Sequence, residues 1–78
     1  MGLFFKKKSL DMNEFERQNQ KLHLSKKQRE QAIRWNMLPK EYIRFNEEAD
    51  SYGLTQYDRE QAVRMGLSPN QFDDEINE

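Results

Sequence analysis

The stretch that decides the fold is REQAVR at residues 59–64, because REQAIR occurs thirty positions earlier, at residues 29–34. The match continues on both sides of the hexapeptide and aligns residues 24–42 with residues 54–72. Self-similarity at a fixed period of this length indicates one supersecondary unit that is used twice. The sequence therefore predicts a repeated helical unit of 30 residues.

Residues that start and end helices recur at the same spacing. Asn36 aligns with Gly66, and both residue types tolerate the left-handed conformation that ends many helices. Pro39 aligns with Pro69, and proline is favoured at the first position of a helix. We therefore expect a positive φ at Gly66. The change Asn36→Gly is expected to be neutral or slightly stabilising.

These boundary signals, together with the spacing of apolar residues, predict an all-α fold of five short helices. The helices are expected near residues 11–22, 26–35, 39–52, 56–65 and 69–76. In chain order they form two and a half tandem helix-turn-helix hairpins. The predicted core contains Phe15, Leu22, Leu24, Ile33, Trp35, Leu38, Tyr42, Phe45, Leu54, Ala62, Val63, Leu67 and Phe72.

The composition of the chain limits its size and its core. Its 78 residues make one domain at most, which we expect over residues 10–78, and only 35% of them are apolar. A chain this short buries a small share of its surface, so a second copy or a partner could complete the core. The chain has no cysteine, which fits a cytoplasmic location and leaves no disulfide.

Charge is distributed unevenly along the chain. Residues 1–44 contain eleven Lys or Arg and five Asp or Glu, whereas residues 45–78 contain two and nine. Such a split favours head-to-tail pairing of copies as a homo-oligomer, or contact with a charged partner. The simpler alternative is a monomer whose charges are solvated. The predicted basic patch is Lys26, Lys27 and Arg34, and the predicted acidic patch is Asp73, Asp74 and Glu75.

Residues 1–9 are predicted to form a flexible basic and aromatic arm. Phe4 and Phe5 precede three lysines, a combination that suits weak contact with an anionic membrane. Lys6 occupies the position where N-myristoylation requires Ser or Thr, so that modification is not expected. The N-terminus also lacks the features of a secretory signal. The alternative is a frayed end whose phenylalanines cover the core.

Residues that could carry catalysis are scarce. The chain has one histidine, no cysteine and no glycine-rich phosphate loop. His23 is expected in a turn, where it can interact with free carbonyls at a helix end. Arg29, Glu30, Arg59 and Glu60 are expected to decorate exposed helix faces. We therefore predict that the protein is not an enzyme and has no catalytic residue, cofactor or metal site.

The repeated segment resembles the core of a helix-turn-helix, in which a small residue and a glycine turn precede apolar contacts. The matching positions are Ala62, Gly66, Leu67 and Phe72, and in the first copy Ala32, Asn36, Met37 and Tyr42. This resemblance implies a nucleic-acid-binding regulator that uses the basic N-terminal half. However, the second helix of the second copy carries the acidic patch, which phosphates would repel.

Residues 54–55 (Leu-Thr) and 66–72 (Gly-Leu-Ser-Pro-Asn-Gln-Phe) give the chain a second resemblance. They look like the helix starts and turns of small helical proteins encoded by phages and mobile elements of Gram-positive bacteria. The resemblance implies an accessory or adaptor protein that binds a host or phage protein, and it carries over no catalytic residue.

The leading hypothesis is a non-enzymatic helical binding module that acts through protein–protein contacts. Aromatic residues are its expected anchors, since aromatic side chains often dominate binding energy. They are Trp35, Tyr57, Phe4 and Phe5. The alternative is the nucleic-acid-binding regulator, and a membrane-associated adaptor rests on the arm alone. The sequence does not name the partner.

Overall fold

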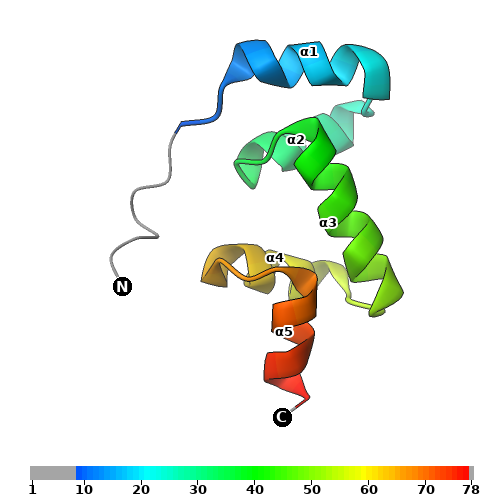
Figure 1. Cartoon of the computed structure of the whole chain (residues 1–78), viewed down its shortest axis with the longest axis vertical. Helices are drawn as coiled ribbons and strands as arrows, with labels where there is room; N and C mark the ends of the chain where they lie inside the picture. The colour runs from blue at the N-terminus through cyan, green and yellow to red at the C-terminus, as the bar shows by residue number, and fades with distance from the viewer. Residues whose placement is uncertain (1–8, 78) are drawn as a thin grey trace. The chain divides into compact units, whose positions relative to one another are not determined.

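The computed structural model describes residues 9–77, and all regular secondary structure in this range is α-helical (Figure 1). The predicted all-α fold is therefore confirmed, and each helix begins and ends within one residue of its predicted bounds. The helices are α1 (Met12–Leu22), α2 (Lys26–Arg34), α3 (Pro39–Ser51), α4 (Gln56–Met65) and α5 (Pro69–Ile76). The predicted arm, with Phe4 and Phe5, lies outside the described residues apart from Ser9.

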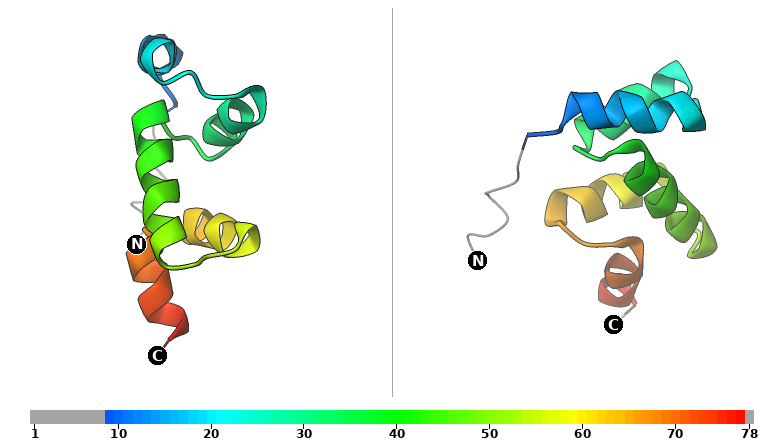
Figure 2. Two further views of the ribbon diagram at one scale, coloured as in Figure 1. Left: turned by 90° about the vertical axis from the view of Figure 1, so that its right-hand side faces the viewer. Right: turned by 45° about the horizontal axis from the view of Figure 1, so that its top comes forward.

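The chain divides into two compact units, Met1–Ile43 and Arg44–Glu78, with the boundary inside α3. The first unit contains α1, α2 and the first residues of α3. The second contains the rest of α3, which α4 and then α5 follow (Figure 2). A single domain over residues 10–78 and superposition of the two repeat copies remain predictions.

The helices begin where side chains satisfy free backbone N–H groups. Asp11 accepts hydrogen bonds from the backbone of both Asn13 and Glu14 at the start of α1. Three further helices begin with a reciprocal capping box, in which the cap and the third helical residue bond to each other's backbone. These pairs are Ser25 with Gln28, Thr55 with Asp58, and Ser68 with Gln71. The helix starts are thus determined locally.

Four of the five helices, α1 to α4, end at a residue in the left-handed conformation. The φ of Gly66 is 74°, which confirms the predicted positive value. The Leu67 N–H donates to the Ala62 carbonyl at 2.9 Å, and the Gly66 N–H donates to the Val63 carbonyl at 3.1 Å. Together these bonds form a Schellman motif, which satisfies carbonyls that the helix leaves free. Among residues 9–77, the other residues with positive φ are His23, Asn36 and Gly53.

The same backbone bond closes α2 and α3. The Met37 N–H donates to the Ala32 carbonyl at 2.9 Å, and the Leu54 N–H donates to the Ala49 carbonyl at 3.0 Å. At the end of α1 the Asn19 side chain replaces the carbonyl, and its Oδ1 accepts from the Leu24 N–H at 2.7 Å. Asn19, which interrupts the apolar stripe of this helix, therefore has a structural role in the turn.

The core of the first unit is built from aromatic and small residues. Phe15 and Ala32 are fully buried. Trp35 packs against Tyr42 with 5.7 Å between ring centroids. The Tyr42 hydroxyl donates to Gln31 Oε1 at 2.8 Å, so this polar group is satisfied inside the unit. The predicted core of this unit is therefore correct for its aromatic members.

The core of the second unit contains Phe45, Ala49, Leu54, Ala62 and Phe72. Sequence reasoning overestimated the burial of aliphatic residues across the chain, because helices this short bury only the centre of an apolar stripe. The predicted core residues that are only half-buried are Leu22, Leu24, Ile33, Leu38, Val63 and Leu67. The predicted core also omitted four buried alanines and prolines near the turns, which are Ala32, Ala49, Pro39 and Pro69.

The turn after α4 gives a test of backbone conformation. A Cβ placed on Gly66 would meet no atom within 4 Å, so the cost of a substitution comes from its φ of 74°. We expect Gly66→Val to lower the free energy of unfolding by about 1–3 kcal/mol. Gly66→Asn is the matched control, because Asn36 adopts the same conformation with a φ of 59°. Equal unfolding midpoints for the two variants in urea would contradict this explanation.

Candidate partner-binding surfaces

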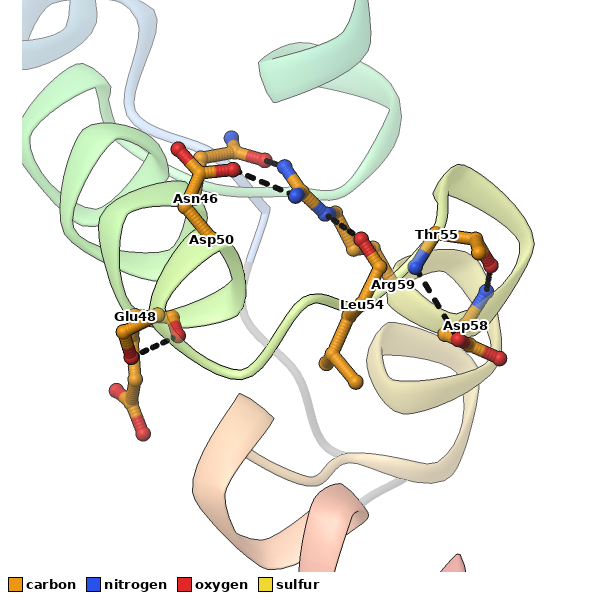
Figure 3. Close-up of polar contacts among 8 residues, drawn as sticks. Asn46, Glu48, Asp50, Leu54, Thr55, Asp58 and Arg59 are labelled. Atoms are coloured by element: carbon orange, nitrogen blue, oxygen red, sulfur yellow. Dashed lines mark hydrogen bonds and ion pairs between the residues drawn. The ribbon is translucent and has the colours of Figure 1, made fainter.

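The repeated arginine of the second copy joins α4 to α3 (Figure 3). Arg59 Nη1 donates to Asn46 Oδ1 at 2.8 Å, and Arg59 Nη2 donates to Asp50 Oδ1 at 2.6 Å. Its Nε donates to the Leu54 carbonyl at 3.1 Å in the intervening turn. The side chain is only 17% exposed. The expectation that Arg59 decorates an exposed helix face is therefore wrong, because three acceptors surround its guanidinium.

The repeated arginine of the first copy makes the corresponding connection between α2 and α1. Arg29 forms an ion pair with Glu16, which lies thirty positions before Asn46. Its guanidinium also lies over the Phe15 ring, 5.6 Å from the centroid. Arg29 is more exposed than Arg59, with 39% of its side chain accessible. The arginine that begins the repeated hexapeptide thus has a structural role in both copies.

The predicted basic patch lies on α2 in the first unit. Lys26, Lys27 and Arg34 are all exposed. Lys27 and Arg34 are seven positions apart and therefore share one side of the helix, whereas Lys26 lies about 100° around it. The patch is thus a line of two cations with a third to one side. Its role in binding stays a prediction.

The two described aromatic anchors have opposite environments. Tyr57 is 70% exposed on α4, so it is available for contact with another molecule. Trp35 is only 5% exposed and packs on Tyr42. The prediction that Trp35 belongs to the core is therefore confirmed, and we leave it out of the candidate contact surface.

The predicted acidic patch lies on α5 in the second unit. Asp74 and Glu75 are exposed, whereas Asp73 is half-buried and accepts a hydrogen bond from the Asn77 side chain at 3.0 Å. The last turn of α5 contains no basic residue. Carboxylates near the negative end of a helix dipole are unfavourable without a nearby cation. This end of α5 is therefore suited to contact with a positively charged group.

Further apolar side chains are exposed on the helices of the second unit. Met65 is 49% exposed at the end of α4, and Ile76 is 54% exposed at the end of α5. Neither residue was singled out from the sequence. Tyr57 and Met65 together give α4 apolar area at both ends of its exposed side.

A pocket of about 160 Å³ lies between α1 and the start of α3, within the first unit. We call it the α1–α3 pocket. Its lining residues are Glu14, Arg17, Gln18, Lys21, Leu22 and Lys40. Gln18 connects the two helices, because its Oε1 accepts from the Lys40 backbone N–H at 3.0 Å. None of these residues was among the sites predicted from sequence, since their proximity depends on the packing of two helices.

The corresponding place in the second unit has a different composition. Glu48, thirty positions after Gln18, accepts from the Asn70 backbone N–H at 2.9 Å, so the connection between helices recurs. Tyr52 takes the place of Leu22, and its hydroxyl donates to Asn70 Oδ1 at 2.8 Å. Asn70 itself takes the place of Lys40. The aligned differences at these two positions were the sequence signal that could have identified the α1–α3 pocket.

The described residues offer no metal-binding cluster and no membrane-spanning helix. Within residues 9–77, no group of three or more His, Cys, Asp or Glu side chains is placed to hold a metal ion. None of the helices in this range is both long and apolar enough to cross a lipid bilayer. Comparisons of the chain with protein-family models, curated proteins and solved structures find no match.

The two repeated arginines should differ in their contribution to stability. Arg59→Gln removes hydrogen bonds to three acceptors around a mostly buried side chain, and we expect a loss of about 1–3 kcal/mol in the free energy of unfolding. Arg29→Gln is the matched control at the aligned position. Because Arg29 is more exposed, its loss should cost less than about 1 kcal/mol. Urea unfolding monitored by circular dichroism measures both, and a larger loss for Arg29→Gln would contradict the prediction.

Proposed function

We propose that this protein is a non-enzymatic helical binding module that acts through protein–protein contacts, with the outer side of α4 as its main contact surface. The observation that carries the proposal is the 70% exposure of Tyr57 on a capped helix. A large aromatic side chain exposed in this way is costly to leave in water and suits a partner pocket.

Two exposed side chains of α4 and the half-buried Gln61 follow the spacing of a helix that binds in a groove. Tyr57, Gln61 and Arg64 are at positions i, i+4 and i+7, which form one stripe along a helix. Met65 lies beside this stripe, and the fully buried Ala62 marks the opposite side. Tyr, Met and Arg are enriched at protein interfaces, and Tyr and Arg often dominate their energy. The composition of this surface thus supports a protein partner.

The ends of α4 are held in place, which favours binding. Thr55 and Asp58 form the capping box at its start, and Gly66 ends it with a left-handed turn. Arg59 joins the helix to α3 through its bonds to Asn46 and Asp50. A surface that is already ordered loses less conformational entropy when it binds. The resemblance to small phage and mobile-element proteins favours an accessory or adaptor role toward a host or phage protein.

Affinity capture with the full chain tests this proposal. We expect an immobilised wild-type chain to retain a specific protein from a Gram-positive bacterial lysate, and Tyr57→Ala/Met65→Ala to retain at least about 30-fold less at equal load. That factor corresponds to the loss of about 2 kcal/mol expected for an interface hot spot. Met12→Ala is the control, because Met12 is 39% exposed in the first unit.

The identified partner is then titrated against the purified variants. Equal affinity for the wild type and for Tyr57→Ala/Met65→Ala would exclude α4 as the contact surface. Retention of no specific protein, with the chain folded by circular dichroism, would count against the binding function itself.

Nucleic-acid binding is the second candidate, and the exposed line of cations on α2 favours it. Lys27 and Arg34 share one side of that helix, with Lys26 nearby. The carboxylates of Asp74 and Glu75 argue against it. They lie on α5, the second helix of the second copy, and in a helix-turn-helix the second helix enters the DNA groove. Electrophoretic assays with duplex DNA across a salt series test whether the protein binds nucleic acid. A complex that weakens with salt and is lost in Lys27→Gln/Arg34→Gln would support this candidate.

A further inference from the structure

We propose that the α1–α3 pocket binds a carboxylate from α5 of a second copy of the chain, so that copies associate head to tail. The proposal does not depend on the α4 surface, because it uses different residues. It rests on three observations: the charge and size of the pocket, the exposed carboxylates of α5 that make no ion pair within residues 9–77, and the different residues at the aligned place in the second unit.

The charges that line the pocket are unequal. Arg17, Lys21 and Lys40 contribute three positive charges, and Glu14 contributes one negative charge. Glu14 is already engaged, since its Oε1 pairs with Arg17 Nη1 at 2.8 Å and its Oε2 accepts from Gln18 Nε2 at 3.0 Å. Among residues 9–77, neither Lys21 nor Lys40 makes an ion pair. The pocket therefore has two cations available for an anion.

The backbone adds to this positive potential. Lys40 is the second residue of α3, where the N-terminal end of the helix carries a partial positive charge. A lysine at this end is unfavourable by itself, but an incoming carboxylate would be attracted by both the side chain and the helix end. Lys21 lies in the last turn of α1, the other helix that lines the pocket. An anion between them would be held from two helices.

The size of the pocket limits its occupant. Its volume of about 160 Å³ is smaller than the roughly 300–1,000 Å³ typical of small-molecule sites. One side chain fits such a space better than a cofactor does. Leu22 and the two lysines line it, and their aliphatic parts can contact the methylene groups of an Asp or Glu side chain.

The carboxylates of α5 match this requirement. Asp74 and Glu75 are exposed, and within residues 9–77 neither makes an ion pair. They lie near the C-terminal end of a helix whose last turn has no cation. Contact with Lys21 and Lys40 of another copy would relieve the unfavourable interaction with the helix dipole. The same chain thus carries both halves of a complementary pair.

The corresponding place in the second unit lacks the three cations of the α1–α3 pocket. The positions aligned with Arg17, Lys21 and Lys40 are Glu47, Ser51 and Asn70, and none is basic. Tyr52 also reaches Asn70 through its hydroxyl, where Leu22 has no polar group. The cationic pocket is in the first unit and the acidic helix in the second, so the contact joins different surfaces. Such heterologous contacts build rings or open chains of copies.

Sedimentation of the full chain over a range of concentrations tests the proposal. We expect association at about 20 mM salt that weakens as salt approaches about 500 mM, because exposed charges are screened. Lys21→Gln/Lys40→Gln should weaken it at least about tenfold. Lys26→Gln/Lys27→Gln is the matched control: it removes the same charge from the basic patch of α2, the rival surface for head-to-tail pairing, and should change the constant little. Leu22→Tyr/Lys40→Asn, which gives the pocket the residues found at positions 52 and 70, should also weaken association.

A charge exchange identifies the two surfaces as partners. Lys21→Glu/Lys40→Glu and Asp74→Lys/Glu75→Lys should each be monomeric alone, and an equimolar mixture of the two should associate. Helical circular dichroism of each variant confirms folding, and lysines near the end of α5 are compatible with its dipole. A monomeric wild type at every salt and concentration would overturn the proposal. So would equal effects of the pocket variant and the matched control, or a mixture that stays monomeric.

Discussion

The architecture depends on left-handed residues at the helix ends. Gly66 and Asn36 reverse the chain at positive φ, and the backbone N–H that follows each one donates to an alanine carbonyl of the helix just completed. The alanines are fully buried, because the turn carries the next segment across them. Capping side chains then start the following helix within a few residues. Short, tightly joined helices give a small chain its core without disulfides.

The repeated arginines act on this framework of turns. Arg59 connects α4 to α3 and to the turn between them, and Arg29 connects α2 to α1. The first residue of the recurring hexapeptide therefore holds helices together. Differences between aligned positions carry the candidate functions instead. Tyr57 aligns with Lys27, so α4 carries an aromatic anchor where α2 carries a charge. Asn70 aligns with Lys40, so the second unit lacks this pocket cation.

Sequence reasoning succeeded wherever the determining interactions are local. A capping box or a left-handed turn involves residues within six positions of each other, so residue types such as those at Ser68 and Gly66 are sufficient to place it. It failed where interactions join separate helices. The acceptors of Arg59 lie on α3 and in the following turn, and an isolated helix pattern makes such an arginine look exposed. The same limit applies to Trp35. From the sequence it could be a core residue or a partner contact, and only the residues that pack against it decide between the two.

The amino-acid sequence by itself determined the helices, their ends, the aromatic members of the core and the uneven charge along the chain. These follow from backbone sterics, capping and apolar spacing, which are properties of short segments. Tertiary structure decided which side chains remain accessible. It buried Trp35 and exposed Tyr57, and it brought Lys21 of α1 and Lys40 of α3 to one pocket. Burial and proximity arise only when helices pack, because each depends on atoms that are distant in sequence.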